Sequence, residues 1–281
     1  MPLAPAGALS PLNESRNVGF LVDLHTHSSE SSACASQSVE ELISRAEAVG
    51  LDGVALTDHN RIEGALKAQR LTRRRRLKVF VGVEVLTEEI GDVLVYGLRQ
   101  SFPDAPISFR RLAKAADKEG AVMFAAHPFR RHARNGLWVY LEETGFDWRR
   151  EVLLPDLLRP LTGLEVYNGG ATPQENQDAV LFSSRFRLLG MAGSDAHGLL
   201  RVGWCATEFE YAVDDERQLV QALRMGHFTV SDRHSEFDSE AERRNHIKSV
   251  SELRGQELAD YMQSWIRRKQ APRTRRRPPA S

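Results

Sequence analysis

The stretch that decides the fold is Val18-Gly19-Phe20-Leu21-Val22, which runs directly into Asp23-Leu24-His25-Thr26-His27. A short apolar run that ends in polar residues is typical of a strand buried on both faces. Residues two apart in an extended chain face the same side, so the imidazoles of His25 and His27 can meet one metal ion. The rest of the chain repeats this arrangement.

Six further apolar runs predict strands, at residues 53–56, 79–83, 93–96, 121–126, 163–167 and 188–192. Helical patterns lie between and after them, at residues 38–50, 108–119, 174–187 and 214–225. The first of these begins like a capping box, with Ser38 as N-cap and Glu41 three residues later. Alternating strands and helices predict an α/β fold with a mostly parallel sheet. Residues 129–161, which contain Trp138 and Trp148, interrupt the alternation and are interpreted as an insertion.

Histidine or a carboxylate follows most of these runs, at His59, Glu84, His127, Asp195 and His197. In a parallel barrel the carboxyl ends of the strands converge on one mouth. Each position alone also fits a loop residue, a turn or a helix cap. Their conjunction, with five of the nine histidines at strand ends, indicates a metal cluster.

A mixed nitrogen and oxygen ligand set suits Zn, Mn or Fe. Seven ligands exceed what one ion needs, so we expect at least two ions that share a carboxylate. Paired ions can activate a bridging water and hold a phosphoryl oxygen. The sequence has neither a glycine-rich phosphate loop nor a serine nucleophile elbow, which leaves a metal-bridging hydroxide as the expected nucleophile.

The successive motifs resemble those of the PHP (polymerase and histidinol phosphatase) domain family, in order over residues 20–230. They lie at residues 23–27, 57–60, 82–84, 126–128 and 193–197. Residues 164–169 and 202–209 resemble the C-terminal part of stand-alone members. The resemblance implies a distorted (β/α)7 barrel, two or three divalent ions and hydrolysis of a phosphate ester.

The resemblance also implies roles for single residues. It assigns the first ion to His25, His27, Glu84 and Asp195, the second to Glu84 and His127, and the third to His59 and His197. Two expected ligand places depart from the family pattern, because Ser31-Ser32-Ala33 and Leu94 stand there. Glu30 or Cys34 is a candidate substitute for the first, although Cys34 also fits a small buried residue.

Arginines are candidates for binding the phosphate, because a guanidinium donates two parallel hydrogen bonds. Arg130 and Arg131 follow His127-Pro128, and Arg201 lies just after His197. Solvated surface arginines are the alternative interpretation. Asn168 is expected to orient the substrate or to begin a turn. Arg130 or Arg201 is expected to balance charge in the transition state, and Asp195 or His197 to move a proton to the leaving group.

The 281 residues carry 38 basic and 38 acidic side chains, but the balance conceals an uneven distribution. Residues 267–281 hold seven basic groups and no acidic one, which leaves 31 basic against 38 acidic groups in the rest. We predict a disordered leader at 1–16, the barrel at 17–232, a helical segment at 233–266 and a disordered basic tail at 267–281. Contact of the tail with nucleic acid is a further hypothesis. A second basic cluster, Arg70, Arg73–Arg76 and Lys78, is either a solvated surface or a guide for a polyanionic substrate.

Two cysteines form no disulfide framework, and no apolar run reaches the length of a membrane span. We therefore expect a cytoplasmic protein, and the resemblance implies that it is a phosphatase or phosphodiesterase. The expected substrates are nucleotides, nucleoside bisphosphates or short oligonucleotides. The alternatives are a histidinol-phosphate phosphatase and a binding or regulatory module that has lost turnover with its two missing ligands.

Overall fold

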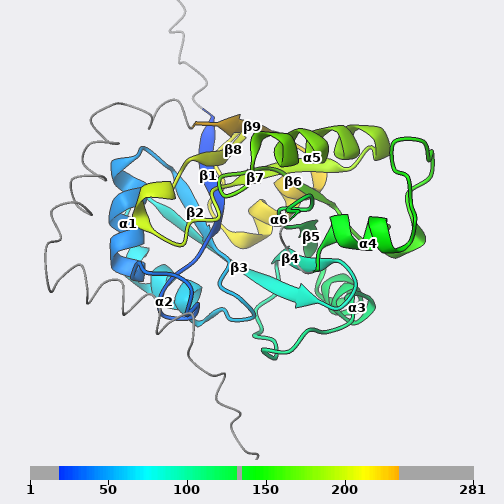
Figure 1. The fold of residues 1–281 in the computed structure, drawn as a ribbon. Coiled ribbons are helices and arrows are strands. Elements are labelled where there is room, and N and C mark those ends of the chain that lie inside the picture. The colour runs from blue at the N-terminus through cyan, green and yellow to red at the C-terminus, as the bar shows by residue number, and fades with distance from the viewer. Residues whose placement is uncertain (1–18, 132–134, 234–281) are drawn as a thin grey trace, which may run out of the picture.

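The computed structural model describes residues 19–131 and 135–233 (Figure 1). The expected leader, basic tail and nearly all of the C-terminal helical segment lie outside these residues. The strands are β1 (Phe20–Thr26), β2 (Gly53–Leu56), β3 (Lys78–Thr87), β4 (Gly91–Tyr96), β5 (Val122–Ala125), β6 (Gly163–Asn168), β7 (Leu189–Gly193), β8 (Cys205–Phe209) and β9 (Phe228–Asp232). The helices are α1 (Val39–Ala48), α2 (Glu63–Thr72), α3 (Phe109–Glu119), α4 (Leu137–Glu143), α5 (Pro173–Phe186) and α6 (Glu216–Met225), with short 3-10 turns η1 (Asp156–Leu158) and η2 (Leu199–Arg201).

The nine strands form one sheet in the order β7-β6-β5-β4-β3-β2-β1-β8-β9. All seven predicted strands are present, as β1 to β7. The prediction of a mostly parallel sheet is wrong, because four of the eight strand pairings are parallel and four are antiparallel. The three residues between β3 and β4 are too few for a crossover connection and force an antiparallel hairpin.

The sheet curls until β1 and β7 come together, which makes it a nearly closed barrel and confirms the predicted fold class. Thr26 and Ala196 form a parallel bridge, and the amide of Asp195 donates to the carbonyl of His25 over 2.8 Å. The buried Asp23 carboxylate accepts from the amides of Ser194 and Gly203, each at 2.9 Å. We call this junction of residues 23–27 with residues 193–196 the seam.

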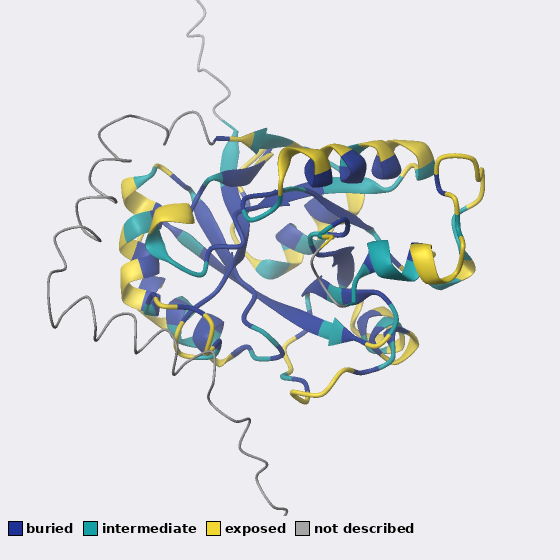
Figure 2. Ribbon diagram, in the orientation of Figure 1, coloured by how far each residue is buried: buried dark blue, intermediate teal, exposed yellow. Residues whose placement is uncertain are grey.

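Two apolar layers hold the barrel together, and the strands are buried along most of their length (Figure 2). One layer fills the barrel interior with side chains such as Phe80, Tyr96 and Phe124. Helix α6 adds Leu219 and Leu223 to this layer at the end opposite the mouth. The other layer packs α1, α2, α3 and α5 against the outside of the strands.

The capping signal that the sequence predicts at the start of the first helix is present in the structure. The predicted capping box of α1 is confirmed, with the Ser38 side chain accepting from the Glu41 amide and the Glu41 side chain returning to Ser38. The interval 129–161 contains α4 and η1 and connects the parallel strands β5 and β6. Within the described residues, no helix has both the length and the apolarity needed to span a membrane.

The second basic cluster lies away from the barrel mouth. Arg70 is in the last turn of α2, and Lys78 begins β3 beside Gly53, the first residue of β2. His59 follows the other end of β2. Arg70, Arg73, Arg75 and Lys78 of the cluster line a cavity of about 440 Å³ together with Arg99. It therefore does not line the site that the histidines form.

Candidate metal centre

The seven residues expected to bind metal all lie at the barrel mouth. His25 lies near the end of β1 and His27 follows it, His59 follows β2, and Glu84 lies in β3. His127 follows β5, and Asp195 and His197 follow β7. A bulge between Asp23 and Thr26 interrupts the regular register of β1 with β2 at the point where His25 lies. His25 and His27 are fully buried, as is Glu84.

His25 is held by a carboxylate behind it that the sequence interpretation missed. Its Nδ1 lies 2.9 Å from Oε1 of Glu165, a fully buried residue of β6. Since a carboxylate only accepts, Nδ1 carries the proton, and in the neutral ring Nε2 is left as an acceptor. That Nε2 lies 3.1 Å from His27 Nε2, 3.4 Å from Glu84 Oε1 and 3.5 Å from Asp195 Oδ1.

Atoms that carry lone pairs therefore face one another across the centre of the site. A bound cation would interact favourably with all of them. Oε2 of Glu84 is buried and accepts no hydrogen bond among the described residues, although it lies 2.9 Å from His59 Nδ1. Three groups have ligand atoms within 4.8 Å of one another: His25, His27 and Glu84; His27, His59 and His197; and His59, Glu84 and Asp92. The residues present thus fit divalent metal ions.

The pKa values of His25, His27 and Glu84 are shifted by burial and by the charged groups around them. Burial lowers the pKa of His25, but the carboxylates of Glu165, Glu84 and Asp195 outweigh it and raise that pKa well above its usual value. Burial brings the pKa of His27 down to about 3. Burial raises the pKa of Glu84, but the neighbouring His25 and His59 bring it well below its ordinary value.

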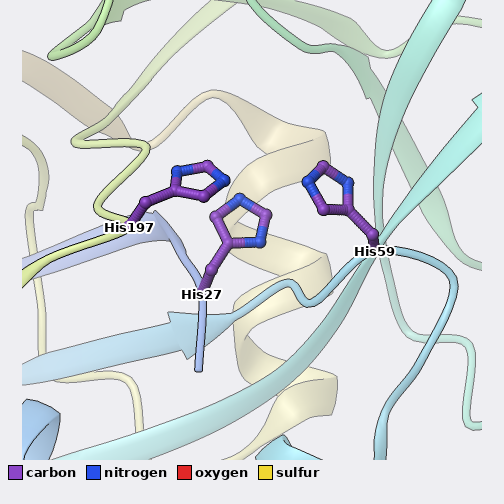
Figure 3. Close-up of side chains that lie close together, drawn as sticks. All are labelled: His27, His59 and His197. Atoms are coloured by element: carbon purple, nitrogen blue, oxygen red, sulfur yellow. The ribbon is translucent and has the colours of Figure 1, made fainter. Parts of the chain in front are cut away.

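His27 stands between two other rings at one side of the mouth (Figure 3). Its ring centroid lies 4.6 Å from that of His59 and 4.2 Å from that of His197. His197 Nδ1 donates a hydrogen bond to the carbonyl of Asp195 over 3.0 Å, which fixes the orientation of the ring. In this tautomer Nε2 of His197 keeps its lone pair.

The other side of the mouth contains Asp92, which the sequence interpretation also missed. His127 Nε2 lies 3.1 Å from Glu84 Oε1 and 3.9 Å from Asp92 Oδ2. The expected ligand place at Leu94 is two residues deeper on the same face of β4, where Leu94 is fully buried in the interior apolar layer. Asp92, at the start of β4, is the polar side chain at the rim. Burial, and then the nearby Glu84 carboxylate, raise the pKa of Asp92 to about 6.

The turn after β1 is organised by Asp58 rather than by a metal ligand in the Ser31-Ser32-Ala33 segment. Ser32 donates its hydroxyl to Asp58 Oδ1 over 2.8 Å, and Ser28 donates to Oδ2 over 2.7 Å. Glu30 pairs with Lys67 over 2.8 Å and accepts from the amide of Val39 at the start of α1.

Cys34 is the member of this turn that faces the histidines. Burial raises the pKa of its thiol, but His197 and His59 outweigh this and bring it down to about 6. Cys34 is exposed, so the alternative of a small buried residue is wrong.

Two of the expected phosphate-binding arginines converge beside the site. Arg130 donates to Asp195 and, over 3.2 Å, to Asn168 Oδ1. A Cβ atom placed on Gly170 would lie 3.2 Å from Arg130 Nη2 and 3.3 Å from Arg201 Nη1, so the two guanidinium groups flank this glycine. Asn168 is fully buried, and its amide donates to Glu165 Oε2 over 2.9 Å.

Arg131 does not join this group. Its guanidinium pairs with Asp178 of α5 over 2.8 Å and stacks on Trp138 at 4.8 Å. Adjacent arginines thus face different parts of the molecule, which the sequence alone does not separate.

The backbone is strained at the same mouth. Asn60, His127 and Asp195 have positive φ angles of 58°, 29° and 53°. Residues other than glycine rarely adopt this conformation, and when they do it is often at functional sites.

Comparison with known proteins supports this fold. The chain is 30% identical over 95 residues to the uncharacterized protein MJ1587 of Methanocaldococcus jannaschii, a match of 33% of this chain and 54% of that protein. A two-domain protein from Bacteroides vulgatus ATCC 8482, which contains a predicted PHP-like metal-dependent phosphoesterase, superposes with a TM-score of 0.56 at 17% identity, over 75% of this chain and 64% of that one. The lesion-specific endonuclease PfuEndoQ from Pyrococcus furiosus superposes with a TM-score of 0.54 at 16% identity, over 75% of this chain and 57% of that one.

These matches cover about half to two thirds of the related chains, and at these identities the superpositions show the fold. The model of the PHP domain family matches residues 23–271, which is most of the chain. The resemblance read from the motifs is confirmed, and the chain belongs to the PHP domain family.

Proposed function

We propose that the chain is a metal-dependent phosphoesterase that hydrolyses a phosphate ester of a nucleotide, nucleoside bisphosphate or short oligonucleotide. The observation that carries the proposal is that His27 Nε2, Glu84 Oε1 and Asp195 Oδ1 all lie within 3.5 Å of His25 Nε2, with two arginines beside them.

Two or three divalent ions, of Mn, Zn or Fe, bind at the mouth. His25, His27, Glu84 and Asp195 hold one ion, and Glu84 and His127 hold a second, to which Asp92 adds a carboxylate. His59 and His197 belong to a third position. When bound, the ions polarise the phosphoryl group and activate water for hydrolysis.

The chain's own residues bind and orient the phosphate. Arg130 and Arg201 donate to its oxygens from either side of Gly170. Nε of Arg130 is buried and has no hydrogen-bond partner among the described residues, which leaves a donor for a substrate oxygen. Asn168 positions Arg130. Asp195 or His197 passes a proton to the leaving oxygen; their Oδ1 and Nδ1 lie 3.4 Å apart.

The nucleotide class of substrate is supported by the likeness to an endonuclease fold. Contact of the basic tail with nucleic acid stays a prediction, as does the cytoplasmic location.

A substrate panel tests the proposal. A nucleoside monophosphate, a nucleoside bisphosphate, a short oligonucleotide and histidinol phosphate are assayed with Mn²⁺, Zn²⁺ or Fe²⁺. We expect hydrolysis of at least one nucleotide substrate, and Arg130→Gln should lower kcat/KM by about 10²–10³-fold, as loss of a charge-stabilising donor does.

The matched variant Arg131→Gln should change kcat/KM only slightly, because that guanidinium faces α5. A preference for histidinol phosphate would contradict the proposed nucleotide substrates and favour a histidinol-phosphate phosphatase. Absence of hydrolysis with every ester and metal would leave a binding module as the surviving interpretation.

A further inference from the structure

We propose that the cavity lined by Arg70, Arg73, Lys78 and Arg99 is a second binding site, for a ligand with two or more adjacent phosphate groups. We call it the basic cavity. It is separate from the metal centre, so the inference goes beyond the proposed function and does not depend on hydrolysis at the mouth.

The basic cavity lies at the end of the barrel opposite the mouth. Lys78 begins β3, and Glu84 of the metal centre lies further along the same strand. Since a strand rises about 3.3 Å per residue, these two residues are roughly 20 Å apart. A phosphate group bound in the basic cavity therefore contacts none of the residues that face the metal.

Three separate elements bring the cations of the cavity together. Arg70 and Arg73 lie in and just after the last turn of α2, three positions apart and so on the same side of the helix. Lys78 belongs to β3, and Arg99 follows β4. Cations near a helix C-terminus interact favourably with the helix dipole, but this explains neither Lys78 nor Arg99. The convergence instead indicates a site for an anion.

Ion pairs engage two of the five cations that line the cavity. Arg75 pairs with Glu47 over 2.9 Å, and Lys78 pairs with Asp214 over 2.8 Å. Asp214 is the acidic side chain among the described residues of the lining. The remaining three cations therefore decide the charge of the cavity.

These three are Arg70, Arg73 and Arg99, and none of them forms an ion pair with a carboxylate in the described part of the chain. Arg99 donates to the side-chain oxygen of Gln69 over 3.0 Å, and the nitrogen of the same amide donates to Glu216. The amide orients Arg99 without neutralising it. Three uncompensated guanidinium groups at one cavity attract an anion with several charges.

The lining also indicates the class of ligand. A guanidinium group donates paired hydrogen bonds that match the oxygens of a phosphate group. The cavity, of about 440 Å³, has the size of a small-molecule site, and none of the described residues that line it is aromatic and could stack on a base. The cavity therefore recognises phosphates rather than bases, either in a polyphosphate, free or on a nucleotide, or in the backbone of an oligonucleotide.

Calorimetric titration tests the inference. The full-length protein is titrated with tripolyphosphate and, separately, with a short phosphorothioate thymidine oligonucleotide, which resists hydrolysis. We expect Arg70→Gln/Arg73→Gln to weaken binding of at least one probe by about tenfold or more, because loss of one hydrogen bond to a charged group already has an effect of this size.

The matched control is Arg74→Gln/Arg76→Gln, which removes the same charge from the same stretch of the chain. Neither residue lines the cavity, and Arg76 lies 3.5 Å from Asp52. This control should bind both probes like the parent. Equal losses in the two double variants would reveal a general effect of charge and overturn the site.

The two probes distinguish the sources of phosphate. Weaker binding of tripolyphosphate in Arg70→Gln/Arg73→Gln supports a site for a polyphosphate, and a loss confined to the oligonucleotide supports a site for the backbone. A parent that binds neither probe overturns the inference, as does unchanged binding of both probes in Arg70→Gln/Arg73→Gln. Since these measurements follow binding and not hydrolysis, either result leaves the proposed function standing.

Discussion

Glu165 links three parts of the site although it is not among the metal-facing residues. Its Oε1 accepts from His25 Nδ1, and its Oε2 accepts from the amide of His127 over 2.8 Å and from the side chain of Asn168. One buried carboxylate therefore orients a ligand ring, the loop after β5 and the residue that positions Arg130. It is a positioning residue for the whole centre.

Glu165→Gln should therefore weaken metal binding. A glutamine has one acceptor oxygen where Glu165 uses two, so its NH₂ group must face either His25 Nδ1 or the donors of His127 and Asn168. Loss of such partners lowers metal affinity by about 10–100-fold. Titration calorimetry of Zn²⁺ into metal-free protein measures the change. Glu142→Gln, at an exposed position of α4, is the control and should bind like the parent. Equal affinities for parent and Glu165→Gln would contradict this role.

The residues that the sequence predicted correctly as neighbours are those that follow the apolar runs in the sequence, because the barrel brings the ends of these runs together whatever the details of packing. Glu165 and Asp92 escaped this reasoning because Glu165 lies inside an apolar run and Asp92 comes before one, rather than after it. A signal for Glu165 existed, since a charge inside a buried apolar run must have a partner. The choice between Arg130 and Arg131 depends on side-chain direction, which spacing does not fix.

At the scale of elements, the seam between β1 and β7 determines whether the centre exists. Gly193, the last residue of β7, lies directly against His25. A Cβ atom there would approach the backbone nitrogen of His25 to 2.7 Å and its Cβ still more closely. The absence of a side chain at Gly193 is what lets the two ligand-bearing strands touch.

Gly193→Ala should separate the strands. We expect the free energy of unfolding to fall by about 1–3 kcal/mol, the usual effect of overpacking, and metal stoichiometry to fall with it. Denaturant unfolding and metal analysis of the purified protein measure both. The control is Gly198→Ala, where the nearest atom to a new Cβ would be Ser36 Oγ at an ordinary 3.4 Å. Normal metal content in Gly193→Ala would refute the link between the seam and the ligands.

Some helices and strands could be predicted from the sequence, and others could not. Periodicity and capping predicted β1 to β7 and α1, since these signals are local. The strand β8 and the strand β9 were missed because each forms by pairing along β1 or β8, a contact between residues distant in sequence. The pairing directions around β4 depend on connection length and packing, which apolar runs do not encode.

For the whole molecule, the buried carboxylates and histidines make metal binding part of stability. Without ions, Glu84 and Asp195 place negative charge in a buried space. Ions that bind only the folded state increase the free energy of unfolding. An ion at a hundred times its dissociation constant contributes about 2.7 kcal/mol.

Removal of metal should thus lower the melting temperature. We expect Tm of chelator-treated protein to rise steadily as Mn²⁺ or Zn²⁺ is added back, as followed by circular dichroism. His25→Ala should show little or no such rise, whereas His227→Ala should respond like the parent, because His227 lies next to Tyr211 and away from the mouth. A parent Tm that is independent of metal would exclude this coupling.

The seam also sets when the centre can form as the protein is made. The Asp23 carboxylate and the Ser194 amide that it holds are 171 positions apart. A ribosome adding about 5–20 residues per second needs roughly 10 to 30 s between the two, during which the first histidines have no Asp195 or His197 to meet. The ligand set from both sides of the seam is therefore complete only after β7 and the two residues that follow it have been made, late in synthesis.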